Sequence, residues 1–224
     1  MASITLSTAT ESDIHYATIT MHSDGKFNPD TLAEFNTALD TVYSDASINA
    51  LIITGEAKSF SQGLDIEYLI SAGQEGAAKF IDECMVMVGR LLTLPIPSVA
   101  AANGHAFGLG AMILMASDYK VMREDRGYFC LPEVDLNMVL IPSMNALVRE
   151  KLSGQFLRNL LLTGERIGAP TAVEYQVIDQ CCDLNDLMTN AKALLQPMLG
   201  KSRDTLSGLK TGLHQDILRY IDQR

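Results

Sequence analysis

The chain has 224 residues, of which 47% are apolar and 20% are charged. This composition excludes a wholly disordered chain and a fibrous repeat, and the length is enough to bury a large core without disulfide or metal staples. The net charge of −10 disfavours nucleic acid and anionic membranes as partners, and leaves room for a local basic patch that meets a phosphorylated small molecule.

In chain order, the first predicted strand covers residues 15–21, whose composition is β-prone. A helix is predicted to begin at Pro29 with Asn28 as its N-cap. An uninterrupted apolar run at 50–55 then predicts a strand that is buried on both faces. The helix that begins at Pro29 has an apolar stripe at helical spacing, which consists of Leu32, Phe35, Leu39 and Val42.

The same order of elements recurs in the next part of the chain, with a second helix around residues 80–91 and a buried strand at 98–102. A third helix runs towards Ser117. Residues 91–117 carry no charge and are long enough to span a bilayer. Prolines and glycines interrupt this segment, so we interpret it as a buried strand, turn and helix.

Short strands are predicted at residues 119–122 and 128–130, and the pattern from Pro142 onward is mostly helical. Strands that alternate with helices indicate parallel βαβ units, followed here by a helical C-terminal part. A loop over residues 67–77 is expected to shape any pocket that lies beside it.

The cysteines do not indicate a metal site or a disulfide framework. Cys84, Cys130, Cys181 and Cys182 follow no metal-ligand spacing, and an adjacent pair suits no ordinary disulfide. The four histidines show no zinc spacing either, and we expect His105 to be a packing residue. The N-terminus has no signal-peptide pattern, so we expect a reduced, cytoplasmic protein without a metal.

Two segments with glycines follow predicted buried strands, at residues 59–66 and 103–110. Loops of this kind meet at the carboxyl ends of parallel strands, where ligands bind. Two backbone amides that converge from them would form an oxyanion hole for a carbonyl oxygen. Spacing alone favours the simpler interpretation of two structural turns. Neither segment matches a dinucleotide fingerprint or a nucleophile elbow well.

Taken together, the motifs resemble the enoyl-CoA hydratase/isomerase (crotonase) superfamily. Its signatures F-S-A-G-A-D-I and N-G-x-A-x-G-G-G match residues 60–66 and 103–110. Residues 128–136 resemble its F-x-x-P-E-x-x-L-G motif, and residues 163–172 resemble its later T-G-x-x-x-x-A segment. Several ordered motifs are more specific than any one of them.

The resemblance implies an α/β fold, the ClpP/crotonase spiral of ββα units with a helical C-terminal part. It divides the chain into a crotonase core domain, residues 1–165, and a C-terminal helical region for trimerisation, residues 166–224. A homo-oligomer, either a trimer or a dimer of trimers, is implied in the same way.

The resemblance also assigns site residues. It makes the backbone amides of Leu64 and Leu109 the oxyanion donors and Glu133 the catalytic acid/base. Lys26 is placed in a loop near the CoA adenine, where it could meet a phosphate, whereas Asp65 is expected to bond loop amides. The residues implied to contact the acyl-CoA are Lys26, Gln62, Gly63, Leu64, Asp65, Ile66, Gly108, Leu109 and Met112.

Met112 stands where the family's hydratases carry a second catalytic glutamate. Hydration of an enoyl thioester uses two carboxylates, whereas moving a double bond from C3 to C2 needs one base that transfers a proton from C2 to C4. We therefore predict an isomerase of fatty acid metabolism that converts 3-enoyl-CoA to trans-2-enoyl-CoA through an oxyanion-stabilised dienolate. No cofactor is implied, since coenzyme A is part of the substrate.

Alternatives remain open at this point. A hydratase or another thioester enzyme of the same fold would take its second acid from elsewhere, such as Glu67 or Asp135. A catalytically idle acyl-CoA-binding subunit would keep the fold without the chemistry. An RNA-binding homologue is disfavoured by the net charge of −10. Asp118 is expected to fix the turn after the third helix.

Overall fold

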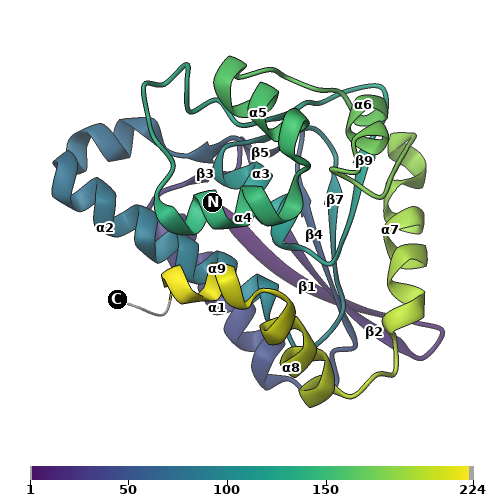
Figure 1. Ribbon diagram of the computed structural model, residues 1–224. Helices are drawn as coiled ribbons and strands as arrows, with labels where there is room; N and C mark the ends of the chain where they lie inside the picture. Colours follow the sequence, from purple (N-terminus) through teal and green to yellow (C-terminus); the bar gives the residue numbers. More distant parts are fainter. Residues whose placement is uncertain (1, 222–224) are drawn as a thin grey trace.

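A sheet with the strand order β1-β2-β4-β7-β9-β11 forms the centre of the structure, a computed structural model that describes residues 2–221 (Figure 1). β1 and β2 are antiparallel, and every later pair in this sheet is parallel. Its strands are β1 (Ile4–Glu11), β2 (Ile14–Met21), β4 (Ala50–Gly55), β7 (Ser98–Ala102), β9 (Tyr119–Arg123) and β11 (Gln180–Cys182).

Shorter strands beside the central sheet carry the glycine-containing segments. They form a sheet in the order β10-β8-β5 and a parallel pair, β3 and β6. Because short parallel pairings fix these segments, both are held by backbone hydrogen bonds. The strands are β3 (Lys26–Phe27), β5 (Ser59–Ser61), β6 (Gly63–Leu64), β8 (His105–Phe107) and β10 (Phe129–Cys130).

The predicted strands at 15–21, 50–55, 98–102, 119–122 and 128–130 are confirmed as β2, β4, β7, β9 and β10. β1 was not predicted, because it is rich in Thr and Ser and mostly exposed, and so lacks an apolar pattern. β11 lies in a part expected to be mostly helical, and it pairs with β9 at the edge of the sheet.

Helices cover both faces of the central sheet. α7 packs against β7 and β9, and in Figure 1 it runs along the side of the sheet opposite α1 and α2. Leu187, Ala191 and Leu195 of α7 bury Ile52 and Val99 on that face. The opposite face lies under α1, α2 and α3 and holds the main core.

The helix that Asn28 was predicted to cap is confirmed as α1. The Asn28 Oδ1 atom accepts a hydrogen bond from the Thr31 amide at 3.0 Å, and the predicted apolar stripe is buried. The helices are α1 (Pro29–Ser44), α2 (Ile66–Leu92), α3 (Leu109–Ala116), α4 (Pro142–Lys151), α5 (Gly154–Thr163), α6 (Ala169–Glu174), α7 (Leu187–Leu195), α8 (Arg203–Leu213) and α9 (Gln215–Ile221).

The prediction of a loop over residues 67–77 is wrong. This segment is the first part of α2, capped by the Asp65 carboxylate, which accepts hydrogen bonds from the amides of Glu67 and Tyr68 at 3.1 and 3.4 Å. Gly73, with φ of 69°, interrupts the helix. Periodicity missed this part because few of its residues are buried.

Residues 91–117 fold as the end of α2 followed by β7, β8 and α3, which confirms the interpretation of a buried strand, turn and helix. Within residues 2–221, no helix has the length and apolar character needed to cross a membrane. The boundary between a core domain of residues 1–165 and a helical region of residues 166–224 stays a prediction.

Candidate active site

The two glycine-containing segments lie against each other. Gly63 has φ of +81°, a conformation that favours glycine. A Cβ atom on Gly63 would lie 2.5 Å from the carbonyl oxygen of Phe107 and 2.9 Å from the amide nitrogen of Leu109. The absence of a side chain therefore lets the Leu64 and Leu109 segments approach within contact distance.

The second amide belongs to the first residue of α3. Leu109 follows Gly108, which has φ of +50°, and amides in the first turn of a helix have no partner within that helix. The Gly108 N–H donates to the carbonyl of Cys130 at 3.1 Å. This bond joins the α3 turn to β10, the strand that leads to Glu133.

Glu133 lies in the segment that follows β10. Reciprocal backbone bonds between Phe129 and Ile167, at 2.9 and 3.0 Å, anchor that strand. The Glu133 backbone carbonyl accepts from the amide of Met138 at 2.9 Å, which closes a turn over residues 133–138. A Cβ on Gly108 would lie 3.8 Å from Glu133 Oε1. The carboxyl group is therefore next to the turn that presents the Leu109 amide.

The Glu133 carboxyl group is in an apolar environment. Its Oε2 atom is buried and has no hydrogen-bond partner in the described structure. Burial raises the pKa of Glu133 above the ordinary glutamate value. A buried carboxyl group with a raised pKa and a free oxygen is suited to take up and return a proton.

A cavity of about 80 Å³ joins these parts. Two polar side chains line it, Gln62 and Glu133, and the Gln62 Nε2 atom donates to the Ser59 hydroxyl at 2.8 Å. The complete lining consists of Gln62, Leu64, Ile66, Ile81, Gly108, Leu109, Pro132, Glu133, Leu136, Met138, Val139, Leu140, Ile141 and Met144.

Six of the residues implied by the resemblance line this cavity, namely Gln62, Leu64, Ile66, Gly108, Leu109 and Glu133. Gly63 is not one of the lining residues, and Lys26 is exposed on β3, directly across from Gly63. Asp65 caps α2. Met112 is fully buried in the core, one turn after Gly108, and is not part of the cavity lining.

Most of the other residues that line the cavity were not predicted from the sequence. They come from the irregular segment between β10 and α4, at residues 136–141, with Ile81 of α2 and Met144 of α4. The one available signal was a run of large apolar residues directly after the Pro-Glu motif. Val139 in this run is 90% exposed, so the wall continues onto the surface.

The other acids considered for catalysis lie outside the cavity. Glu67 and Asp135 are exposed, and neither lines it. Among residues 2–221, Glu133 is the one carboxylate in the lining. Over the same residues, no group of three or more His, Cys, Asp or Glu side chains is arranged to hold a metal ion.

Two further residues have structural contacts. The His105 ring packs beside Phe107 and Tyr128, with centroids 5.1 and 5.6 Å apart. The Asp118 carboxylate accepts from the amide and the hydroxyl of Ser98 at 2.8 and 2.9 Å, so it fixes the turn after α3 as expected.

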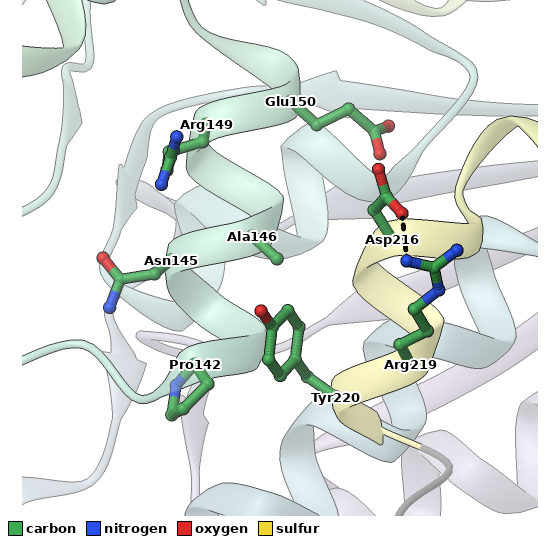
Figure 2. Close-up of a pocket in the computed structure, with 8 residues that line it drawn as sticks. All are labelled: Pro142, Asn145, Ala146, Arg149, Glu150, Asp216, Arg219 and Tyr220. Carbon is green, nitrogen blue, oxygen red and sulfur yellow. Dashed lines mark ion pairs between the residues drawn. The ribbon is translucent and has the colours of Figure 1, made fainter.

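A larger cavity, about 590 Å³, lies between α4 and α9 and contains none of the predicted site residues. Figure 2 shows the Tyr220 ring between the two helices. Its acids already have partners: Asp216 pairs with Arg219 at 3.1 Å, and Glu150 pairs with His214 at 2.6 Å. We therefore assign the candidate active site to the smaller cavity that contains Glu133.

The arrangement of strands and helices, together with the two glycine loops in contact, is that of the crotonase fold. A probable enoyl-CoA hydratase of Mycobacterium tuberculosis superposes on this structure with a TM-score of 0.86 at 22% sequence identity. The superposition covers 97% of this chain and 93% of the other. The implied fold class is thereby confirmed.

The chain belongs to the enoyl-CoA hydratase/isomerase family, whose sequence model matches residues 12–222. Enoyl-CoA delta isomerase 3 of Arabidopsis thaliana is 31% identical over 220 residues, which cover 94% of this chain and 92% of the relative. The peroxisomal enoyl-CoA delta isomerase 2 of the same plant is 34% identical over 174 residues, covering 75% of this chain and 72% of the relative.

Proposed function

We propose that this protein isomerises a 3-enoyl-CoA to the trans-2-enoyl-CoA, with Glu133 as the single acid/base. The observation that carries the proposal is one unpartnered carboxyl group in an apolar cavity, beside two glycine loops that are in contact with each other. The names of the two plant relatives support the same reaction.

In the proposed mechanism, the thioester carbonyl oxygen lies between the N–H groups of Leu64 and Leu109. Glu133 removes a proton from C2, and the electron pair moves into a dienolate whose negative charge rests on that oxygen. The protonated Glu133 then returns the proton to C4, and the double bond forms between C2 and C3. The carboxylate is regenerated, so the reaction is balanced without a co-reactant.

The oxyanion donors and the Glu133 carboxyl group are both expected to contribute to the rate enhancement. An oxyanion donor typically contributes about 10²–10³ in rate, because it stabilises charge that develops in the transition state. A positioned carboxyl group adds about 10²–10⁴ as a general acid/base. The apolar lining increases the contributions of both the oxyanion donors and the carboxyl group, since electrostatic interactions are stronger where water is excluded.

Substrate contacts follow from the same position. We propose that Gln62, Gly63, Leu64, Ile66, Gly108 and Leu109 surround the thioester, and that Lys26 at the rim meets a CoA phosphate. Asp65 acts through the start of α2, and Met112 supports the α3 turn from the core. Coenzyme A enters as part of the substrate, and the reaction needs no other cofactor.

Assembly and location are proposals of the same kind. We propose a trimer or a dimer of trimers in which the C-terminal region, residues 166–224, takes part. The cytoplasmic location expected from the sequence is likewise proposed, and fractionation of the source cells tests it.

The test is an assay of the purified protein with a 3-enoyl-CoA and, separately, with a 2-enoyl-CoA. The absorbance of the conjugated thioester should appear from the first substrate and persist with the second. Loss of that absorbance from the 2-enoyl-CoA would indicate a hydratase. No change with either substrate, while CoA still binds, would favour the catalytically idle acyl-CoA-binding subunit.

A further inference from the structure

The Ser61 side chain is buried at the end of β5, shortly before Gly63. Its hydroxyl makes two hydrogen bonds to backbone groups. It donates to the carbonyl of Gly25 at 2.6 Å, and it accepts from the amide of Gly63 at 3.1 Å. A serine hydroxyl can donate and accept at the same time, so this one group joins the turn before β3 to the loop that contains Leu64.

Ser61 also touches the second glycine loop. A Cβ atom on Gly110 would lie 2.5 Å from the Ser61 carbonyl oxygen, 2.7 Å from its Cβ atom and 2.8 Å from its Oγ atom. Gly110 directly follows Leu109 in the first turn of α3. Because a side chain at these distances would overlap the serine, glycine at position 110 lets the start of α3 pack directly against Ser61. Ser61 therefore contacts both glycine loops of the candidate site.

The turn at Gly25 lies against the other side of this contact. Gly25 has φ of +58°, and a Cβ atom there would lie 3.0 Å from the Ser61 Cα atom. The strand that follows, β3, pairs with β6 so that Phe27 is directly across from Leu64. The hydrogen bond from Ser61 to the Gly25 carbonyl therefore helps to fix the position of β6, and with it the Leu64 peptide, relative to β3.

Both backbone partners of the hydroxyl belong to buried residues, Gly25 and Gly63. Buried backbone groups are nearly always paired, so a loop that loses such a partner must move to pair them again. Gly63 and Leu64 share a peptide group, and a rotation at Gly63 therefore redirects the Leu64 N–H. A misplacement of about 1 Å can cost about 10² in rate.

We propose that Ser61 is a positioning residue of the oxyanion hole. Its hydroxyl holds the Gly63–Leu64 peptide in the orientation in which the Leu64 N–H meets the thioester carbonyl oxygen. Ser61 does not line the cavity, and its hydroxyl donates to a carbonyl and not to a base that would make it a nucleophile. The inference rests on the proposed function and adds a residue to it.

The first test is the kinetics of Ser61→Ala with a 3-enoyl-CoA. We expect kcat to fall by about 10–10²-fold, because the oxyanion donor is displaced and not removed. KM should change much less than kcat. Ser61→Cys keeps a weaker donor and acceptor at the same position, so its kcat should lie between those of the wild type and Ser61→Ala.

The second test needs no turnover. Hydrogen bonds from an oxyanion hole draw electron density in a bound 2-enoyl-CoA toward the carbonyl oxygen, which moves the absorbance of the conjugated thioester to longer wavelength. At saturating 2-enoyl-CoA, Ser61→Ala should show a smaller shift than the wild type. A residue that only stabilises the fold would leave the shift of the folded protein unchanged.

Ser98→Ala is the matched control. Ser98 is also fully buried, and its hydroxyl also makes one donated and one accepted hydrogen bond, both with Asp118, at 2.9 and 3.1 Å. It begins β7, at the opposite end of this strand from the second glycine loop. Ser98→Ala should lose stability but keep the wild-type kcat and the wild-type absorbance shift.

Three results would overturn the role of Ser61. These are a wild-type absorbance shift in Ser61→Ala, an equal loss of kcat and shift in Ser98→Ala, and a wild type that binds the 2-enoyl-CoA without any shift. Circular dichroism checks folding, and if Ser61→Ala does not fold, the shift in Ser61→Cys gives the same decision. A shift that the Ser61 variants reduce, in a protein that does not turn over a 3-enoyl-CoA, would support the role of Ser61 and refute the proposed isomerase function.

Discussion

A side chain on Gly63 would begin 2.9 Å from the amide nitrogen of Leu109, so the two glycine loops of the site are in direct contact. The loops come from different strands, β6 and β8, and are separated by the whole of α2 and β7 in the chain. In the proposed mechanism, this contact lets amides from distant segments act on one carbonyl oxygen. It also makes Gly63 a sensitive position.

We expect Gly63→Ala to reduce kcat by about 10²-fold or more, the typical effect of losing one oxyanion donor. The methyl group would lie 2.5 Å from the Phe107 carbonyl oxygen, and φ of +81° adds backbone strain. The loops must therefore separate. Steady-state kinetics with a 3-enoyl-CoA measures the effect, and KM should change much less than kcat.

Gly154→Ala is the control for this substitution. A Cβ on Gly154 would meet no atom within 4 Å, and the residue begins α5 and is not part of the cavity lining. This variant should retain wild-type kinetics. Equal losses of kcat in the two variants would show that the contact between the loops is not what supports catalysis.

Glu133→Gln should reduce kcat by about 10²–10⁴, since the amide keeps the shape of the side chain and cannot accept the proton from C2. Binding of the 2-enoyl-CoA product, measured by calorimetry, should be retained within a few-fold. Asp135→Asn is a suitable control, because Asp135 is exposed and outside the cavity lining. Unchanged turnover in Glu133→Gln would exclude Glu133 as the base.

The pH dependence of activity should follow the ionisation of Glu133. Burial raises its pKa, and the base form is required, so kcat/KM should fall as the pH decreases through a value above about 4.3, the ordinary glutamate pKa. A profile that stays flat down to pH 4 would show that the catalytic base is a different group.

The same ionisation has a consequence for stability. With a pKa that is raised in the folded state, the folded protein holds the proton more tightly, so stability falls as the pH rises from the ordinary value through the raised one. Glu133→Gln lacks this loss. We expect the variant to be more stable than the wild type at pH 7, and the difference to disappear near pH 4, in urea titrations.

The turns of the two loops could be predicted from local sequence, whereas the role of the carboxylate was implied by the family resemblance. Glycines mark the turns at Gly63 and Gly108, and the Pro-Glu motif marks Glu133. The cavity wall at residues 136–141 could not, since an irregular segment has no periodicity to follow. The way in which α8 attaches to the rest of the chain could not be predicted from the sequence either. It depends on hydrogen bonds from Arg203 and Lys210 to backbone carbonyls of distant segments.

Met112 offers a test of how the site differs from that of a hydratase. Met112→Glu should not yield hydratase activity, because residue 112 is fully buried and outside the cavity lining. An unpaired carboxyl group in this core is expected to cost several kcal/mol. For a chain of this size each kcal/mol lowers Tm by about 2–4 °C, so calorimetry should record a clear decrease.

Met112→Leu is the matched control, since a volume-conserving substitution in a core usually costs less than about 1.5 kcal/mol. Its activity and Tm should remain close to those of the wild type. Hydration of a 2-enoyl-CoA by Met112→Glu would contradict the placement of residue 112 and would mean that its side chain reaches the cavity.

The buried ion pair between Lys210 and Asp118 should be the strongest single attachment of α8. Its side chains are 6% and 15% exposed, and removing one partner from a buried pair typically costs about 3–5 kcal/mol. Lys210→Met should lower the free energy of unfolding by an amount in this range.

Lys192→Met is the control, because Lys192 pairs with Glu11, whose side chain is 55% exposed, and such pairs contribute about 0–1 kcal/mol. Urea titrations at one protein concentration separate the two, since oligomers shift apparent stability with concentration. Similar losses in both variants would mean that the pair between Lys210 and Asp118 does not determine how α8 is attached.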